Sequence, residues 1–235
     1  MDNSTAIILF LVICVFSYFV GSLPFGLWVG IIVKGVDIRT LGSQNIGATN
    51  VIRVLGIGPG VVVFLLDTLK GAVGVILAKN LLPILPVWYY IIIAFLAIIG
   101  HTYSIFLGFK GGKGVATTLG ALLSLNPAMA LLGFAIWIIV VISTKYVSLA
   151  SLIGSATLPI SPFFILKSPD KWWLFGVGLC VFILISIKHR ANILRLKAGT
   201  ESKIWGNYKS NFKEEKLRET DIEKHDDTSE IVEDE

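Results

Sequence analysis

A segment rich in small polar residues follows the first long apolar run. It covers residues 42–50 (GSQNIGATN) and is followed closely by Arg53. Hydroxyl and amide side chains offer both donors and acceptors, and a guanidinium pairs with carboxylate or phosphate oxygens. The segment therefore suits an anionic, hydroxylated ligand. The alternative is an ordinary turn, because glycine, asparagine and serine also serve local backbone needs.

A second segment, residues 109–117 (FKGGKGVAT), places glycines on both sides of Lys113 directly before an apolar run. Glycines let backbone N–H groups approach a ligand, a following helix N-terminus adds unpaired donors, and the lysine adds a full positive charge. This combination is typical of a phosphate site. Its spacing differs from the G-x-x-x-x-G-K-[ST] loop, so nucleotide hydrolysis is not expected. The alternative is a basic loop that sets membrane topology.

A third segment, residues 188–196 (KHRANILRL), continues the last apolar run. If it is helical, His189, Asn192 and Leu196 share one face. An imidazole can move a proton or bind an anion near neutral pH. A histidine at a membrane interface is also a common anchor, so the residues around it must distinguish the two roles. Here it lies among basic residues, which favours an anion site.

Polar residues also occur inside the apolar runs. Asp67 and Lys70 are close enough in sequence to pair on one helix, and charges within a membrane usually face the protein interior or a watery cavity. A structural or gating pair is favoured over a catalytic one. Ser148 and Ser151 share a helix face, although serines there also bond back to their own helix.

Apolar runs long enough to cross a bilayer must position these segments. Hydrophobic residues make up 54% of the 235-residue chain and charged residues only 15%, which is far more apolar than a soluble domain. A crossing helix needs about 20 apolar residues. Uninterrupted candidates cover residues 5–32, 58–78, 87–109, 147–166 and 172–187. The chain is therefore predicted to be an all-α integral membrane protein.

Residues 115–143 form a further apolar run, which Asn126 and Pro127 interrupt. Proline removes a backbone donor and disfavours helix in the residue before it, so this run makes one crossing or two. Two crossings place most basic residues on one face, as expected for cytoplasmic loops. The prediction is seven transmembrane helices, with the N-terminus outside and the C-terminus and polar segments on the cytoplasmic face. Residues 115–125 span only about 16 Å, so a re-entrant hairpin is the alternative.

A change of composition near residue 200 divides the chain. Residues 1–200 form the membrane-embedded region. Residues 201–235 form a charged cytoplasmic tail that we expect to be flexible, because it has too few apolar residues for a core. Cys14 and Cys180 lie in apolar runs, away from any metal-binding spacing. The lipid bilayer is the expected surrounding, and no metal, cofactor or nucleic acid is expected.

The three segments resemble the signature motifs of the bacterial acyl-phosphate:glycerol-3-phosphate acyltransferase family. The similarity covers nearly all of residues 21–203, and the third motif continues to Gly199, Thr200 and Glu201. It implies seven helices in the bacterial plasma membrane and a cytosolic active site. It also implies transfer of a fatty acyl group from acyl phosphate to the 1-hydroxyl of glycerol 3-phosphate, giving lysophosphatidate and phosphate, as the first acylation of phospholipid synthesis. Another enzyme would supply the acyl phosphate.

The resemblance carries substrate contacts onto residues of all three segments and onto Ser151, with Ser148 as its rival. His189 either takes the proton of the attacking hydroxyl or binds a phosphate, oriented by Asn192. Ser104 departs from the proline usual in the family. The predicted catalytic residues are His189, Asn192, Ser43 and Lys113, and the predicted substrate-binding residues are Asn45, Thr49, Asn50, Arg53, Gly111, Gly112, Gly114, Ser148, Ser151 and Arg190.

A membrane transporter for a phosphate-bearing solute is the main alternative, since transporters also bind anions at helix N-termini. Such a protein would hold its site at mid-membrane, whereas these polar groups gather on one face. An acyl-CoA enzyme with an H-x-x-x-x-D motif is not expected. Phe106, Leu194 and Glu230 stand five residues after the three histidines.

Overall fold

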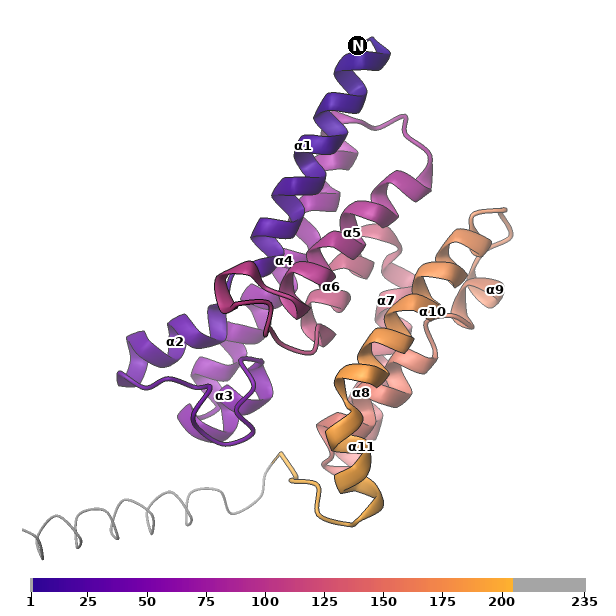
Figure 1. Ribbon diagram of the computed structural model, residues 1–235. Coiled ribbons are helices and arrows are strands. Elements are labelled where there is room, and N and C mark those ends of the chain that lie inside the picture. Colours follow the sequence, from indigo (N-terminus) through magenta and orange to yellow (C-terminus); the bar gives the residue numbers. More distant parts are fainter. Residues whose placement is uncertain (1, 205–235) are drawn as a thin grey trace, which may run out of the picture. The chain divides into compact units, whose positions relative to one another are not determined.

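Helices form the regular structure of the computed structural model, which describes residues 2–204 (Figure 1). They are α1 (Asn3–Ser22), α2 (Phe25–Lys34), α3 (Ala48–Leu55), α4 (Ile57–Leu81), α5 (Val87–Thr102), the short 3-10 helix η1 (Ile105–Leu107), α6 (Val115–Leu125), α7 (Pro127–Thr144), α8 (Val147–Ala156), α9 (Ser161–Ile165), α10 (Lys171–Lys188) and α11 (Arg190–Lys197). The prediction of an all-α chain is confirmed for these residues. Residues 205–235, which make up most of the predicted tail, lie outside the described residues.

Five helical segments of this part of the chain are long and apolar enough to cross a bilayer: Asn3–Lys34, Ile57–Leu81, Val87–Leu107, Pro127–Thr144 and Lys171–Lys188. Two shorter apolar helices, α6 and α8, accompany them. Large apolar side chains are exposed on the outside, for example Ile32 at 81% and Phe164 at 84%. Such an extensive apolar surface is typical of a protein that contacts lipid.

Prolines determine where the predicted apolar runs break. The run 115–143 is divided into α6 and α7, and the Asn126 side chain caps α7 by accepting a hydrogen bond of 3.0 Å from the Met129 N–H. The run 5–32 is also divided, at Leu23 and Pro24, and the run 147–166 becomes α8 and α9. The expectation that these last two runs are continuous was wrong. Proline cannot donate to the preceding turn, and its ring clashes with that turn.

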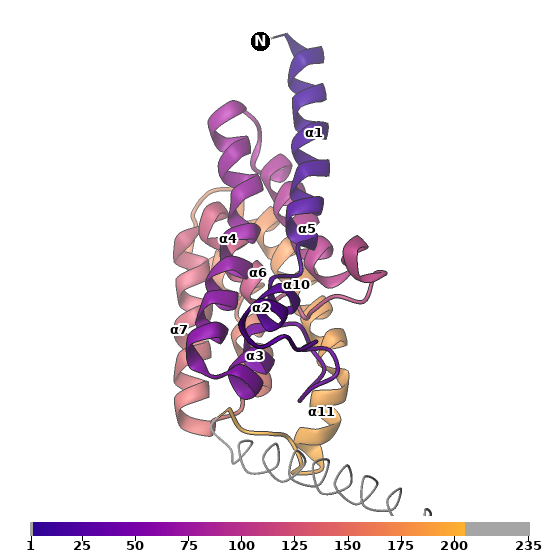
Figure 2. The same ribbon diagram turned by 90° about the vertical axis from the view of Figure 1, so that its left-hand side faces the viewer.

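Glycines bring helices into backbone contact. A Cβ added at Gly71 would lie 2.1 Å from the Thr117 carbonyl oxygen, and one added at Gly120 would lie 1.7 Å from the Thr68 carbonyl oxygen. These contacts hold α4 directly against α6, as small residues do where apolar burial alone cannot drive packing. Figure 2 shows α4 beside α6 and α1 beside α5, and both pairs are in contact.

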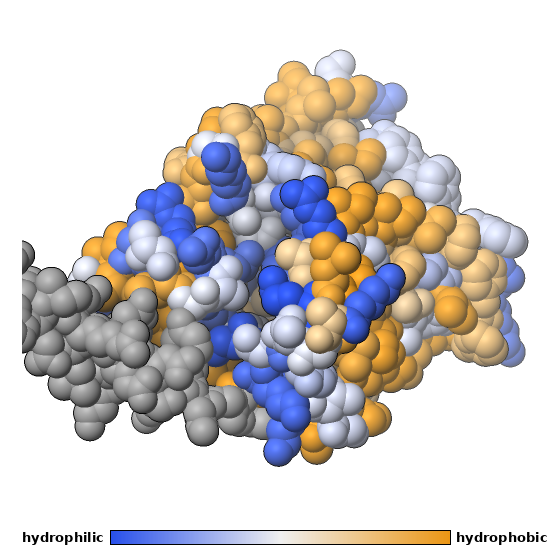
Figure 3. Space-filling view, turned by 60° about the horizontal axis from the view of Figure 1, so that its bottom comes forward, coloured by the Kyte–Doolittle hydropathy of each residue, from blue (hydrophilic) through white to orange (hydrophobic). Residues whose placement is uncertain are grey.

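Hydrophilic residues gather at the end of the helices that carries α2, α3 and α11, and apolar residues cover the flanks (Figure 3). The polar loop before α3, the glycine-rich loop before α6 and the turn between α10 and α11 all contribute residues to one cavity. The fold thus brings together the three segments that the sequence singled out.

Candidate active site

A cavity receives side chains from all three polar segments. Among the predicted site residues, it is lined by Ser43, Asn45, Thr49, Asn50, Arg53, Lys113, Gly114, Ser148, Ser151, His189 and Asn192. Three predicted residues of the described chain do not line it, namely Gly111, Gly112 and Arg190. Arg190 is exposed.

Asn50 fixes the shape of the first loop. Its amide nitrogen donates to the carbonyls of Ile38 (3.1 Å) and Leu41 (3.0 Å), and its side-chain oxygen accepts from the Ser43 N–H (2.8 Å). Only 1% of Asn50 is exposed. Because these bonds use both ends of the amide, Asn50 holds Ser43 at the cavity. Within the same loop, Asn45 accepts a hydrogen bond of 2.9 Å from the Gly47 N–H.

The glycine-rich loop is held by the end of α5. The N–H groups of Gly111 and Gly112 donate to the carbonyls of Thr102 (3.2 Å) and His101 (3.0 Å), so neither amide is directed to a ligand. Gly114 has a φ of 81°, in the left-handed region that favours glycine, and it turns the chain into α6. The loop therefore presents Lys113 and Gly114 to the cavity and uses its first glycines for support.

Lys113 links the second segment to the third. Its ammonium donates to the side-chain oxygen of Asn192 at 2.6 Å. The pKa of Lys113 is lowered to about 8, chiefly by burial; Glu201 opposes this shift, and the charges of Arg195 and Arg53 add to it. The ammonium is thus charged at neutral pH but close to its titration range, and a bound dianion would favour the charged form.

Glu201 completes this network, although the sequence placed it in the tail. Its carboxylate accepts 2.6 Å and 2.7 Å hydrogen bonds from Asn192 and Arg195, and the residue is 8% exposed. Burial alone would raise the pKa of Glu201, but the nearby Ser148 hydroxyl and the hydrogen bonds from Asn192 and Arg195 hold it below its ordinary value. Gly199, with a φ of 70°, reverses the chain after α11, a C-terminal glycine signal readable from sequence.

His189 lies between α10 and α11 and is 3% exposed. Its Nδ1 lies 2.8 Å from the Ile185 carbonyl oxygen. A carbonyl can only accept, so Nδ1 carries the proton and Nε2 is left as an acceptor when the ring is neutral. Burial and, to a smaller extent, the charge of Lys113 lower the pKa of His189 to about 4. The ring is therefore neutral at physiological pH.

Two helix N-termini border the cavity. Gly47, Ala48 and Thr49 at the start of α3 line it, as do Gly114, Val115 and Ala116 at the start of α6. Neither helix has a side-chain hydrogen bond at its N-cap. Each helix start can therefore receive an anion. Lys113 directly precedes Gly114, the N-cap of α6, and Arg53, in the last turn of α3, lines the same cavity. Arg53 also donates to the Ser202 carbonyl at 2.8 Å.

The cavity continues into an apolar arm between α4, α6, α7 and α8. Phe64, Leu122, Ala130, Phe134 and Leu158 line this arm. Ser151 stands at its side, where the hydroxyl donates to the Val147 carbonyl (2.8 Å) and accepts from the Trp137 ring N–H (3.2 Å).

Within residues 2–204, no group of three or more His, Cys, Asp and Glu residues could hold a metal. The site thus offers two anion positions and space for a hydrocarbon chain.

The sequence model of the glycerol-3-phosphate acyltransferase family matches residues 11–199. The chain belongs to this family. A glycerol-3-phosphate acyltransferase of Fusobacterium nucleatum is 44% identical over 80% of this chain and 95% of its own, and one of Geobacter sulfurreducens is 43% identical over 82% and 96%.

Solved structures of PlsY, an integral membrane glycerol 3-phosphate acyltransferase, are also similar. Its glycerol 3-phosphate form has a TM-score of 0.77 and 37% identity, and covers 86% of this chain and 98% of its own. Its lysophosphatidic acid form has a TM-score of 0.74 and 38% identity, over 83% and 94%. The chain is therefore a membrane acyltransferase that uses glycerol 3-phosphate, in phospholipid synthesis, and the transporter alternative is set aside.

For this acyltransferase, the sequence indicated the polar residues that line the cavity but not the apolar ones. Phe134 and Trp137 of α7 are embedded in a uniformly apolar run, so nothing in their spacing separates them from lipid-facing neighbours. Asp67 and His101 also line the cavity. The sequence marked Asp67 as unusual, but only the fold brings His101 beside it.

Proposed function

We propose that this acyltransferase uses acyl phosphate as its donor. The 1-hydroxyl oxygen of glycerol 3-phosphate attacks the acyl carbonyl carbon, and the bond between that carbon and the phosphate oxygen breaks. The hydroxyl proton passes to a phosphate oxygen, and the products are lysophosphatidate and inorganic phosphate. Phosphate is a good leaving group, so the protein chiefly has to position the substrates and stabilise negative charge.

The single observation that carries this proposal is one cavity that has an apolar arm and receives two helix N-termini without side-chain caps together with Lys113 and Arg53. Two phosphate groups and one acyl chain are what acyl phosphate and glycerol 3-phosphate bring. One phosphate lies at Lys113 and Gly114, and the other lies at Arg53 with Ser43, Asn45 and Thr49. The acyl chain lies in the arm beside Ser148 and Ser151.

The pKa of His189 bears on the proton transfer. General bases work best when their pKa lies near the operating pH, and a pKa of about 4 makes this ring a poor base at neutral pH. A substrate phosphate, with a second pKa of about 6, is the better acceptor. His189 then contacts the substrate through Nε2, while Asn192 and Glu201 hold Lys113 against the phosphate bound at this loop.

We further propose seven crossings, with the N-terminus outside and the C-terminus in the cytoplasm of a bacterial cell. The apolar run 115–143 forms two helices, α6 and α7, instead of one. This supports an odd number of membrane crossings. The basic residues near the site would then face the cytoplasm. An enzyme that makes acyl phosphate would supply the donor there.

The test is an assay of the purified protein in lipid with palmitoyl phosphate and glycerol 3-phosphate, following phosphate release and lysophosphatidate. Lys113→Ala is the matched variant, and palmitoyl-CoA replaces the donor in a parallel reaction. We expect product from palmitoyl phosphate only, and much slower product formation in Lys113→Ala. Product from palmitoyl-CoA alone would overturn the proposed donor.

A further inference from the structure

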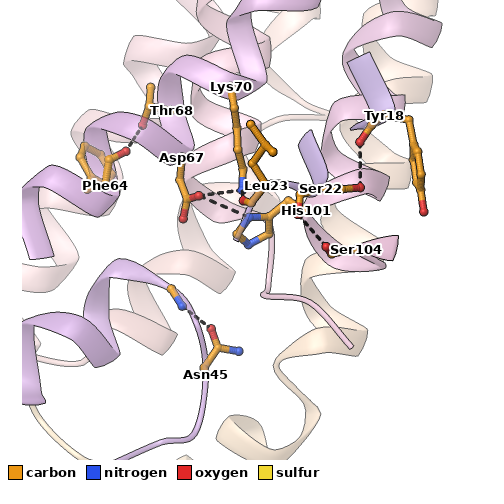
Figure 4. A network of polar contacts seen from close by, with 11 residues as sticks. Tyr18, Ser22, Leu23, Asn45, Phe64, Asp67, Thr68, Lys70, His101 and Ser104 are labelled. Atoms are coloured by element: carbon orange, nitrogen blue, oxygen red, sulfur yellow. Dashed lines mark hydrogen bonds and ion pairs between the residues drawn. The ribbon is translucent and has the colours of Figure 1, made fainter. Parts of the chain in front are cut away.

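Asp67 and Lys70 of α4 meet His101 of α5 in the interior of the protein (Figure 4). Asp67 and Lys70 are each 2% exposed and His101 is 4% exposed. The reaction proposed above assigns no step to any of them. A charged residue within a membrane protein usually marks a functional element, because its burial is unfavourable without a specific partner. These three residues, called the ion cluster here, therefore require an explanation.

One end of the ion cluster is anchored to a break between helices. The Lys70 ammonium lies 2.7 Å from the Asp67 carboxylate and donates to the Leu23 carbonyl at 2.7 Å. Leu23 precedes Pro24, where α1 ends and α2 begins after a break. At this break the Leu23 carbonyl also accepts the Phe25 N–H at 3.1 Å, so Lys70 is its second donor. The amine is thus fixed on both sides.

The other end of the ion cluster contacts the glycine-rich loop. Nδ1 of His101 lies 3.7 Å from the Asp67 carboxylate. The Nε2 edge of the ring faces the loop so closely that a Cβ added at Gly112 would lie 2.2 Å from it. The His101 carbonyl also accepts the Gly112 N–H at 3.0 Å. His101 therefore touches the loop immediately before Lys113 with both its ring and its backbone.

Stability alone does not account for this arrangement. Desolvating an ion pair offsets much of its attraction, and well-packed apolar residues often stabilise an interior equally well. What an ion pair adds is fixed geometry, because its partners tolerate few alternative positions. Here the fixed geometry ends at a loop whose lysine must meet a phosphate.

We propose that Asp67, Lys70 and His101 are positioning residues of the acyltransferase: the ion cluster holds Gly112, and through it Lys113, at the phosphate position. This inference rests on the proposed role of the glycine-rich loop as a phosphate site. It assigns to the ion cluster no contact with the reacting atoms. A displaced Lys113 weakens the binding of the phosphate at this loop and leaves the phosphate at Arg53 unaffected.

The first test is a comparison of His101→Ala with Ser17→Ala in lipid. Ser17 is equally buried and donates to the Ile93 carbonyl at 2.8 Å, but it does not line the cavity. A displacement of about 1 Å can lower activity roughly 100-fold, so we expect kcat/KM to fall roughly 10- to 100-fold in His101→Ala. The KM of one substrate should rise and the KM of the other should not, and Ser17→Ala should change neither.

The second test is a double-mutant cycle with Gly112→Ala. The added methyl group overlaps the His101 ring, so the single variant should lose activity, and His101→Ala should relieve that overlap in the double variant. Effects that simply multiply would show that the ring contact does not position the loop. Asp67→Leu with Lys70→Met removes both charges together and avoids an unpaired buried ion. This pair should reproduce the KM change of His101→Ala.

Two outcomes distinguish this inference from the proposed function. If Lys113→Ala leaves both KM values unchanged, the loop is not a phosphate site and the proposed function loses its basis. If Lys113→Ala raises one KM but His101→Ala only lowers the Tm, as Ser17→Ala does, the proposed function stands and the positioning role is overturned.

Discussion

The ammonium of Lys113 lies 2.6 Å from the side-chain oxygen of Asn192, although 79 positions separate the two residues in the chain. The same Asn192 amide donates to Glu201. One asparagine thus orients a cation and a carboxylate that belong to different segments. The bond explains how a loop before α6 and a helix after α10 act as one site.

Replacement of Asn192 by alanine should remove both of these hydrogen bonds. We expect kcat/KM to fall roughly 10- to 100-fold, because Lys113 loses its orienting partner and Glu201 loses a donor. Steady-state kinetics in lipid measures the effect. Asn80→Ala is the matched control, since Asn80 is exposed on α4 and its amide donates a hydrogen bond to the Ile76 carbonyl of the same helix. Equal activity of the two variants would contradict this role of Asn192.

The pH dependence should follow the ammonium of Lys113. Its pKa is lowered to about 8, so the group is charged below that pH and loses its charge as the pH rises through it. We expect the KM of the substrate bound at this loop to rise above about pH 8. In Lys113→Arg the rise should move to higher pH, because a guanidinium stays charged. Lys34→Arg serves as the control.

His189→Gln separates two roles of the imidazole. Loss of a general base typically lowers the rate by about 10²–10⁴-fold, whereas loss of one neutral contact has a much smaller effect. Since the pKa of His189 is about 4, we expect kcat to stay within about tenfold of the parent. A larger loss, restored by added imidazole, would favour the general base instead.

The size of the apolar arm should determine which acyl-chain lengths the enzyme prefers. The ten residues of α8, which borders the arm, span about 15 Å at 1.5 Å per residue. Ala130 is 2% exposed and lines the arm. Ala130→Phe should lower kcat/KM for palmitoyl phosphate roughly tenfold relative to decanoyl phosphate, since pocket size discriminates chains at this level. Leu131→Phe, at a position that is 55% exposed, should leave the ratio unchanged.

Gly120 should be intolerant of even a methyl group. A Cβ there would lie 1.7 Å from the Thr68 carbonyl oxygen, so α4 and α6 must move apart. We expect Gly120→Ala to lower the free energy of unfolding by about 1–3 kcal/mol, measured by thermal unfolding in detergent. Gly58→Ala is the control, since no atom lies within 4 Å of the added group. A Tm equal to that of the control would show that this contact is not tight.

Much of the fold could be predicted because the bilayer imposes it. Helix is one of very few ways to satisfy backbone groups in lipid, so apolar length reveals the helices, and Pro127 reveals the division of α6 from α7. The breaks at Pro24 and after Ala156 were not predicted. At both places the hydropathy stays high on each side of a proline, so apolar length does not reveal where the helix ends.

The sequence by itself determined which polar groups the three segments offer, because hydroxyl, amide, glycine and basic residues at short spacing are what binds an anion. Only the tertiary structure decided which groups face the ligand. It directs Lys113 and Gly114 into the cavity but ties the amides of Gly111 and Gly112 to α5. It also brings Glu201 and His101 to the site from distant positions. These assignments depend on helix crossings, and crossings arise from contacts between residues far apart in the chain, which local spacing does not encode.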